Sequence, residues 1–256
     1  MRSSLVLLMA MTAALAAGQD PPALASVRKY AINYVLNLPD YTCTQMTARG
    51  YIRYGGPGTG ASSDTVEEEL SFVGGRERYK VIKVNGAPAA NTSHEQLGGA
   101  VSEGEFGSLL KHIFDPATGT GFRPAAAAKL QGRTMNVFNY RVPQFAGYSI
   151  HDGDRNRDLL LAYQGSVWAD QETNAVMRLT MKVVNIPPGT RLAATEMTLE
   201  YKPTELAGRQ YILPSHFELV WRRNAAAQAP QEQGTSRVDF RSYRRFTAES
   251  NIDFSK

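Results

Sequence analysis

The chain has 256 residues, of which 43% are hydrophobic and 20% are charged, and its formal net charge is +4 at pH 7. This composition excludes an intrinsically disordered chain, because it supplies enough apolar surface for a packed core. The length suits one β domain of about 200–250 residues or two smaller domains. The mild positive charge favours anionic partners only weakly.

The first 18 residues are typical of a secretory signal peptide. Arg2 supplies the positive start, an uncharged apolar run extends from Leu5 to Leu15, and small residues around Ala16 suit cleavage. The run is shorter than the roughly 20 residues of a membrane-spanning helix, and an uncleaved anchor is the alternative. We therefore expect a signal peptide at residues 1–18. The mature chain, residues 19–256, is expected to be one periplasmic or secreted domain without a transmembrane segment.

Residues 21–37 are predicted to form an amphipathic helix. Asp20 is a favourable N-cap, and Pro21 and Pro22 suit the first turn. Apolar residues then recur at helical spacing until Pro39, which ends the helix.

The spacing of apolar residues changes to a period of two after this helix, which predicts β-strands. Strands are expected at residues 41–54, 66–73 and 77–84. The pair Gly74-Gly75 between the last two is a hairpin signal, and Asn85-Gly86 predicts the next turn.

A second helix is predicted over residues 102–114. Ser102 and Glu105 have the spacing of a capping box, and Asp115-Pro116 ends the pattern. A single apolar stripe follows the cap, formed by Phe106, Leu109, Leu110 and Ile113. Because the stripe is narrow, this helix should pack on something larger than itself.

The remainder of the chain alternates apolar and polar residues in many short runs, and the segment 224–235, rich in Ala and Gln, is expected to be a loop between two strands. Regular alternation is typical of antiparallel strands with one buried and one wet face. The predicted fold is mainly β (α+β): a single large curved antiparallel sheet, or an incomplete barrel, covered by two or more helices.

No motif for catalysis, a metal or a cofactor stands out. The pair Ser149 and His151 lacks a nucleophile elbow, and the histidines are scattered singly. The acidic run 152–158 suits a calcium loop poorly, because arginines interrupt it; a polar turn with internal Arg–Asp pairs is the simpler interpretation. Cys43, the single cysteine, is interpreted as a core residue, with an intermolecular bridge or a reactive thiol as the alternative. We expect a protein without enzymatic activity and without a cofactor, although a hydrolase site built from several loops remains an alternative.

The stretch from Gly165 to Leu179, GSVWADQETNAVMRL, resembles a recurring strand–turn–strand of the periplasmic lipoprotein-carrier group. This group comprises the outer-membrane lipoprotein-sorting proteins of the LolA and LolB type. The resemblance implies an incomplete barrel closed by helices around an apolar cavity for acyl chains. The longer loops of this chain, and the bulky Phe217, Trp221 and Phe240, depart from that pattern, since the large side chains could fill a cavity. Segments 38–45, 104–110 and 240–246 also resemble an uncharacterised family of secreted proteins of soil bacteria.

The leading functional hypothesis is a non-enzymatic binding or carrier protein of the cell envelope, with an apolar ligand such as a lipid or a lipoprotein acyl chain. The ligand would lie between the sheet and the helices near residues 21–37 and 102–114. The expected lining residues are Met177, Leu179, Met181, Phe217 and Trp221. The alternative is an envelope structural or interaction protein with a filled core and no small-molecule ligand.

Arginines interleave with aromatic residues near the C-terminus. Arg237, Arg241, Arg244 and Arg245 alternate with Phe240, Tyr243 and Phe246. The signal peptide argues against nucleic acid as a partner, and an anionic envelope partner is the functional hypothesis. The alternative is that these arginines pair across strands with Glu200 and Glu218.

Overall fold

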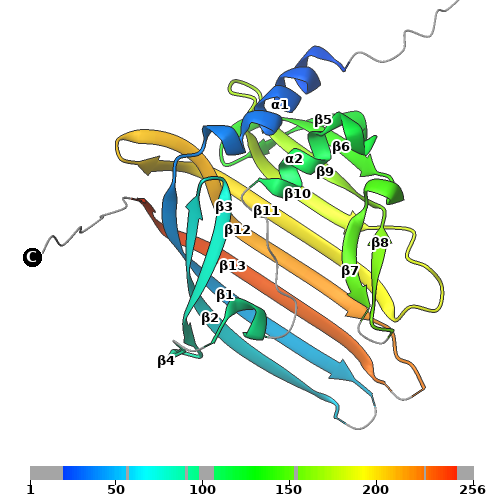
Figure 1. Cartoon of the computed structure of the whole chain (residues 1–256). Coiled ribbons are helices and arrows are strands. Elements are labelled where there is room, and N and C mark those ends of the chain that lie inside the picture. Colours follow the sequence, from blue (N-terminus) through cyan, green and yellow to red (C-terminus); the bar gives the residue numbers. More distant parts are fainter. Residues whose placement is uncertain are drawn as a thin grey trace, which may run out of the picture.

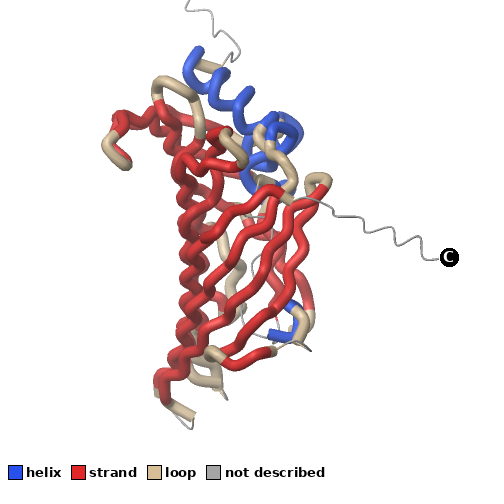
Figure 2. The backbone as a smooth tube through the Cα atoms, turned by 90° about the vertical axis from the view of Figure 1, so that its left-hand side faces the viewer, coloured by secondary structure: helices blue, strands red, loops and turns tan. Residues whose placement is uncertain are grey.

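The computed structural model describes residues 20–55, 58–89, 92–97, 107–152, 155–227 and 229–246. The predicted signal peptide at residues 1–18 lies outside the described residues. Strands dominate the described chain, and the two α-helices lie together at one end of it (Figures 1 and 2). Among these residues, no helix has the length and apolar character needed to cross a membrane.

Eleven strands form one antiparallel sheet in the order β4-β3-β2-β1-β13-β12-β11-β10-β9-β6-β5. The bounds are β1 Tyr41–Tyr54, β2 Gly60–Val73, β3 Arg76–Val84, β4 Ala87–Pro88, β5 Gly121–Leu130, β6 Arg133–Val142, β9 Tyr163–Asp170, β10 Val176–Val183, β11 Leu192–Leu206, β12 Arg209–Arg223 and β13 Gln231–Arg245. Strands β7 Tyr148–Asp152 and β8 Arg157–Leu161 form a separate hairpin. The outermost strands, β4 and β5, do not pair with each other, so the sheet is open. The predicted mainly β fold, with one large antiparallel sheet and helices against it, is confirmed.

The predicted turns follow from residues that tolerate positive φ. Gly74 and Gly75 join β2 to β3 with φ of 59° and 76°, as a tight hairpin between right-twisted strands requires. One expectation was wrong. The segment 224–235 is not entirely a loop, because β13 already begins at Gln231 and pairs there with the end of β1.

Two α-helices are described, α1 Pro22–Asn33 and α2 Ser108–Phe114. The 3-10 helices are η1 Val35–Asn37, η2 His94–Leu97, η3 Pro116–Thr118 and η4 Gln144–Ala146. Helix α1 and η1 together confirm the predicted helix at 21–37, but Asp20 is not the N-cap. Pro21 holds that position, and the Asp20 carboxylate accepts a hydrogen bond from Arg28 Nε at 2.6 Å instead.

The second helix is shorter than expected as far as it is described. Helix α2 begins at Ser108 with Gly107 as N-cap, and it ends at Phe114, as predicted, with Asp115 as C-cap. The expected capping box, Ser102 and Glu105, lies outside the described residues. Leu110, Ile113 and Phe114 of α2 are buried.

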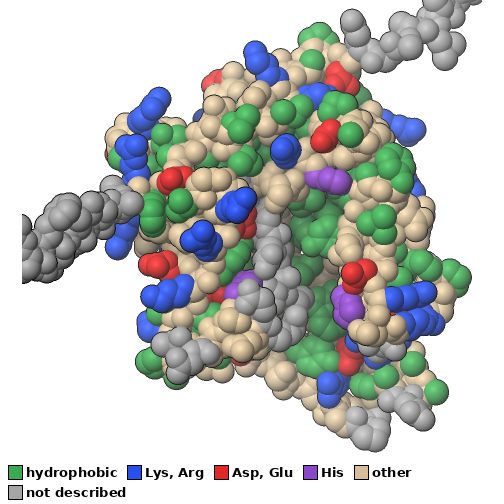
Figure 3. Space-filling view, viewed as in Figure 1, with side chains coloured by type: hydrophobic (Ala, Val, Ile, Leu, Met, Phe, Trp, Pro, Cys, Tyr) green, Lys and Arg blue, Asp and Glu red, His purple; other side chains and the backbone are tan. Residues whose placement is uncertain are grey.

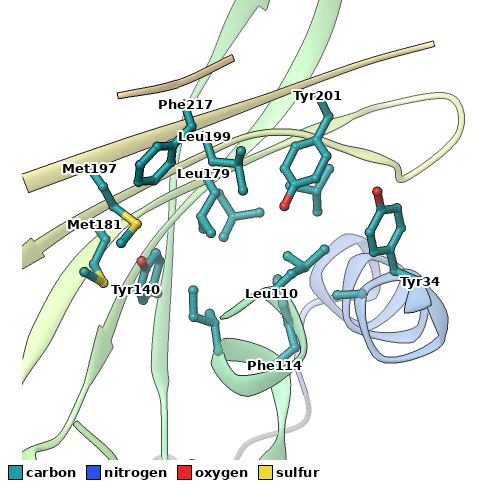
Figure 4. Close-up of a cluster of buried hydrophobic side chains, with 14 of the residues drawn as sticks. Tyr34, Leu110, Phe114, Tyr140, Leu179, Met181, Met197, Leu199, Tyr201 and Phe217 are labelled. Carbon is teal, nitrogen blue, oxygen red and sulfur yellow. The ribbon is translucent and has the colours of Figure 1, made fainter. Parts of the chain in front are cut away.

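Both helices pack on one end of the sheet's concave face. Figure 4 shows Tyr34, Leu110 and Phe114 pointing toward side chains of the central strands. The facing residues on the sheet include Leu179, Met181, Leu199, Tyr201 and Phe217, each no more than 2% exposed. Burial of such a side chain contributes about 1.5–3 kcal/mol, so this packing is the main source of stability at the helical end.

Cys43 lies in this core, on β1. Its side chain is buried, and burial raises the pKa of the thiol to about 12. A thiol with so high a pKa is a poor nucleophile, which agrees with the interpretation of Cys43 as a core residue.

Candidate ligand-binding cavity

The register of five neighbouring strands places inward-facing residues in rows that run across the sheet. Successive strands β2, β1, β13, β12 and β11 contribute one residue each, and alternate residues along a strand share a face. The row beside the helical core is mostly apolar: Val66, Thr47, Val238, Phe217 and Leu199. This row continues the packed core.

The next three rows, farther from the helices, change in character. In order from the core they are Asp64, Arg49, Ser236, Leu219 and Met197; Ser62, Tyr51, Gly234, Trp221 and Thr195; and Gly60, Arg53, Glu232, Arg223 and Leu192. Small and polar residues replace large apolar ones here. The concave face therefore has a filled apolar end and an open, mixed end.

A cavity of about 850 Å³ lies over this open end. The three rows supply its floor, and the β7–β8 hairpin with Leu97 of η2 supplies its walls. Figure 1 shows the hairpin across the concave face from β2 and β3, and Figure 3 shows hydrophobic side chains in the hollow beside it. The volume falls in the range of about 300–1,000 Å³ of small-molecule sites.

The hairpin and β12 supply most of the apolar lining of the cavity, beside the polar Ser149, His151 and Asp152 of the hairpin. Tyr148, Ile150 and Leu159 face it from the hairpin, and Leu219 and Trp221 face it from β12. The hairpin side chains and Leu219 can bury the chain of an acyl ligand through the hydrophobic effect.

The β1–β2 side of the cavity is polar, and its charges are paired. Arg49 Nε donates to Asp64 Oδ1 at 2.7 Å, and this carboxylate raises the pKa of Arg49. Such a two-pronged guanidinium–carboxylate pair has a fixed geometry. It can offer both donors and acceptors to a polar ligand group.

A second polar group lies at the far row, around Glu232. Its carboxylate accepts from Tyr51 Oη at 2.5 Å and from Arg223 Nη1 at 3.3 Å. Arg191 approaches the same carboxylate at 3.3 Å and Arg53 at 3.7 Å. Burial and the Glu232 carboxylate raise the pKa of Tyr51, so its hydroxyl stays protonated and remains a donor.

A buried polar cluster positions η2 beside the cavity. His94 Nδ1 lies 2.6 Å from Glu68 Oε1, and Gln45 Nε2 donates to Glu68 Oε2 at 2.9 Å. The His94 ring also stacks on Tyr79 with ring centroids 4.3 Å apart. These contacts hold η2 against β1, β2 and β3, and thereby place Leu97 at the cavity.

Only part of the predicted lining set meets at this cavity. Trp221 lines it. Leu179, Met181 and Phe217 lie in the packed core under the helices. Met177 belongs to a second buried cluster with Met135 and Val137, next to a register irregularity between β9 and β10. Sequence reasoning missed Arg49, Asp64 and Glu232, because polar residues in strands are normally read as a solvated face.

The predicted arginine patch divides in two. Arg237 Nε donates to Glu218 at 2.9 Å and Arg241 Nη2 donates to Asp239 at 2.9 Å. Arg244 and Arg245 are exposed near the C-terminal end of β13. An anionic partner for this patch stays a prediction.

The described residues of the acidic run at 152–158 include the end of β7 and the start of β8, and Arg155 lies 3.7 Å from Asp152. Within the described residues, no group of three or more His, Cys, Asp or Glu side chains could hold a metal ion.

Comparison with known proteins gives similarity to solved structures only. No protein-family model matches the chain, and no curated protein matches it. A LolA superfamily protein from Nitrosomonas europaea is 10% identical, with 91% of this chain and 97% of that chain covered and a TM-score of 0.36. An outer membrane lipoprotein-sorting protein domain from Vibrio parahaemolyticus is 12% identical, with 91% and 94% covered and a TM-score of 0.36.

A DUF1329 family protein from Desulfovibrio piger is 9% identical, with 92% and 98% covered and a TM-score of 0.37. The lipoprotein-carrier group that the sequence motifs resemble is represented among these solved structures. These similarities are distant, so the function proposed below rests on the contacts of this chain.

Proposed function

We propose that this chain is a non-enzymatic carrier of the cell envelope that holds an acyl or lipid-like ligand in the cavity at the open end of its sheet. The observation that carries the proposal is the contrast between the two ends of the concave face. Side chains fill the helical end, whereas a cavity of about 850 Å³ lies over the other. A partly open hollow of this size, lined by apolar side chains and a few polar groups, is typical of a ligand site.

The position of the ligand differs from the one that the sequence suggested. The helices complete a solid core, and the β7–β8 hairpin is the element that encloses the cavity. Phe217 thus acts in packing, while Trp221, in the same strand, faces the cavity. The acyl chain would lie along the hairpin, with its polar end toward the sheet floor.

The envelope location rests on the N-terminal sequence. The apolar run from Leu5 to Leu15 after Arg2, followed by small residues, is typical of an exported protein. A protein in that compartment encounters lipids and lipid-modified proteins, which are the ligands that the cavity suits.

The proposal is tested with two phenylalanine substitutions in one strand. Thr195 lies in the cavity floor and is 6% exposed, whereas Thr198 lies on the opposite face of β11, opposite Thr180. Thr195→Phe should project a ring into the cavity and weaken binding of a fluorescent fatty acid about tenfold or more, and Thr198→Phe should leave the binding unchanged.

Native mass spectrometry of each purified protein supplies the second readout. A stoichiometric lipid should accompany the wild type and Thr198→Phe but not Thr195→Phe. If the wild type carries no lipid and binds no added fatty acid, the carrier function is wrong, and an interaction protein without a small ligand takes its place.

A further inference from the structure

Trp221 lies flat on the floor of the cavity, in a position that a glycine makes available. Trp221 on β12 stands directly opposite Gly234 on β13. A Cβ at Gly234 would lie 2.2–2.4 Å from three atoms of the indole, Cε2, Nε1 and Cζ2. The ring therefore covers the inward side of Gly234, and any side chain there would push it off the sheet.

Tyr51 extends this aromatic surface. It is the partner of Gly234 on the other side, and its ring centroid is 5.8 Å from that of Trp221. Since one face of the indole rests on the backbone of β13, the other face points away from the sheet. Trp221 and Tyr51 both line the cavity, with their ring planes inclined at 40° to each other, so the indole is the flat part, or platform, of the aromatic surface presented to whatever occupies it.

Paired polar groups flank the platform on both sides. Arg49 and Asp64 lie one row nearer the core, and Glu232 and Arg223 lie one row farther out. Rows on one face of a strand are about 7 Å apart. Arg223 stands on the same strand as Trp221 and Glu232 on the next, whereas Arg49 and Asp64 stand on β1 and β2, so a ring on Trp221 would lie nearest to the Arg223–Glu232 pair. Thr195 and Ser62 complete the middle row.

This arrangement matches the surface of a sugar. A pyranose ring has a weakly polar face of C–H groups, which packs on an indole, and hydroxyl groups around its rim. Each hydroxyl can donate to a carboxylate and accept from a guanidinium. An uncharged hydroxyl can bind to these groups while the Arg49–Asp64 and Arg223–Glu232 ion pairs stay intact. An anionic head group would instead compete with the carboxylate of each pair for its arginine.

We infer that Trp221 is the platform of a head-group subsite that stacks a sugar ring, so that the ligand is a sugar-headed amphiphile. The inference rests on the proposed carrier function, with the acyl part on the hairpin side and the sugar on the platform. It makes Gly234 a positioning residue, which acts by keeping the indole flat.

The test compares two probes that share a dodecyl chain and differ in the head group. Dodecyl maltoside and dodecyl phosphate are titrated below their micelle concentrations into the wild type and Gly234→Ala, with heat of binding as the readout. The wild type should bind the maltoside more tightly. Gly234→Ala, which tilts the indole, should weaken the maltoside about tenfold and leave the phosphate unchanged.

Further variants keep the result independent of folding defects. Trp221→Phe should retain part of the preference for maltoside, and Trp221→Leu should lose it. Trp168→Phe, at the only other tryptophan, should behave as wild type. Equal binding of both probes by the wild type, or a preference for the phosphate, would overturn the sugar subsite and leave the carrier function intact. Binding of neither probe would remove the carrier function as well.

Discussion

Asp170 shows how a single buried carboxylate fixes local structure. It lies at the end of β9, is 1% exposed, and accepts from Arg133 Nε at 2.5 Å and Nη2 at 2.9 Å. The backbone N–H and the hydroxyl of Thr173 donate to its Oδ1, both at 2.9 Å. These bonds close the turn between β9 and β10, and the hydrogen bonds from Arg133 hold the pKa of Asp170 well below its usual range.

Asp170→Asn should destabilise the chain by about 2–3 kcal/mol, because a neutral amide cannot replace the charged acceptor. The lowered pKa gives the effect a pH dependence. The contribution of the carboxylate is complete above about pH 4, the pKa of an unfolded Asp, and is lost as the pH falls through the folded-state pKa. The difference in the free energy of unfolding between variant and wild type, measured with urea, should therefore be smaller at about pH 3 than at pH 7. An equal difference at both would refute this role.

At the scale of elements, α2 packs on the helical end of the concave face and fills it. Leu110 and Phe114 project from it into the cluster that includes Leu179 and Leu199 (Figure 4). The β7–β8 hairpin has a different role, because a space remains between its residues Ile150 and Leu159 and the floor of the sheet. One element thus closes a core and the other encloses a cavity.

Leu110→Ala should lower the free energy of unfolding by about 2–5 kcal/mol, since Leu110 is 1% exposed and its loss leaves a void. Lys111→Ala, at an exposed neighbouring position, should change it by no more than about 0.5 kcal/mol. Fatty-acid affinity of the folded Leu110→Ala protein should equal that of the wild type. A folded variant that loses its ligand would place the binding site under the helices instead.

At the scale of the whole molecule, the open sheet is one surface divided between stability and binding. The sequence predicted the strands of this sheet better than it predicted which part of the sheet lines the cavity. Periodicity and turn residues identified β1 with its bounds and the β2–β3 hairpin, because these depend on neighbours in sequence. Strand β5 gave no alternation to detect, since its middle is the run Ala125–Ala128.

The cavity escaped prediction because long-range register builds it. Arg53 of β1 and Glu232 of β13 are paired in the sheet although they lie far apart in sequence. In sequence, Glu232 lies in a segment that resembles a loop, and Gly234 gives no sign that it lies under Trp221. Sequence analysis therefore found the elements and one cavity residue, Trp221, but not the polar rows beside it.

The most direct test of the account uses Trp221 as its own reporter. The chain has two tryptophans, so Trp168→Phe leaves Trp221 as the only one, and the reciprocal variant Trp221→Phe leaves Trp168. Each is titrated with a brominated fatty acid, whose bromine quenches only nearby indoles. We predict saturable quenching of Trp221 and none of Trp168. The Trp168 ring lies away from the cavity, under the guanidinium of Arg178. Equal quenching of both, or binding without quenching of Trp221, would show that the ligand does not occupy the cavity.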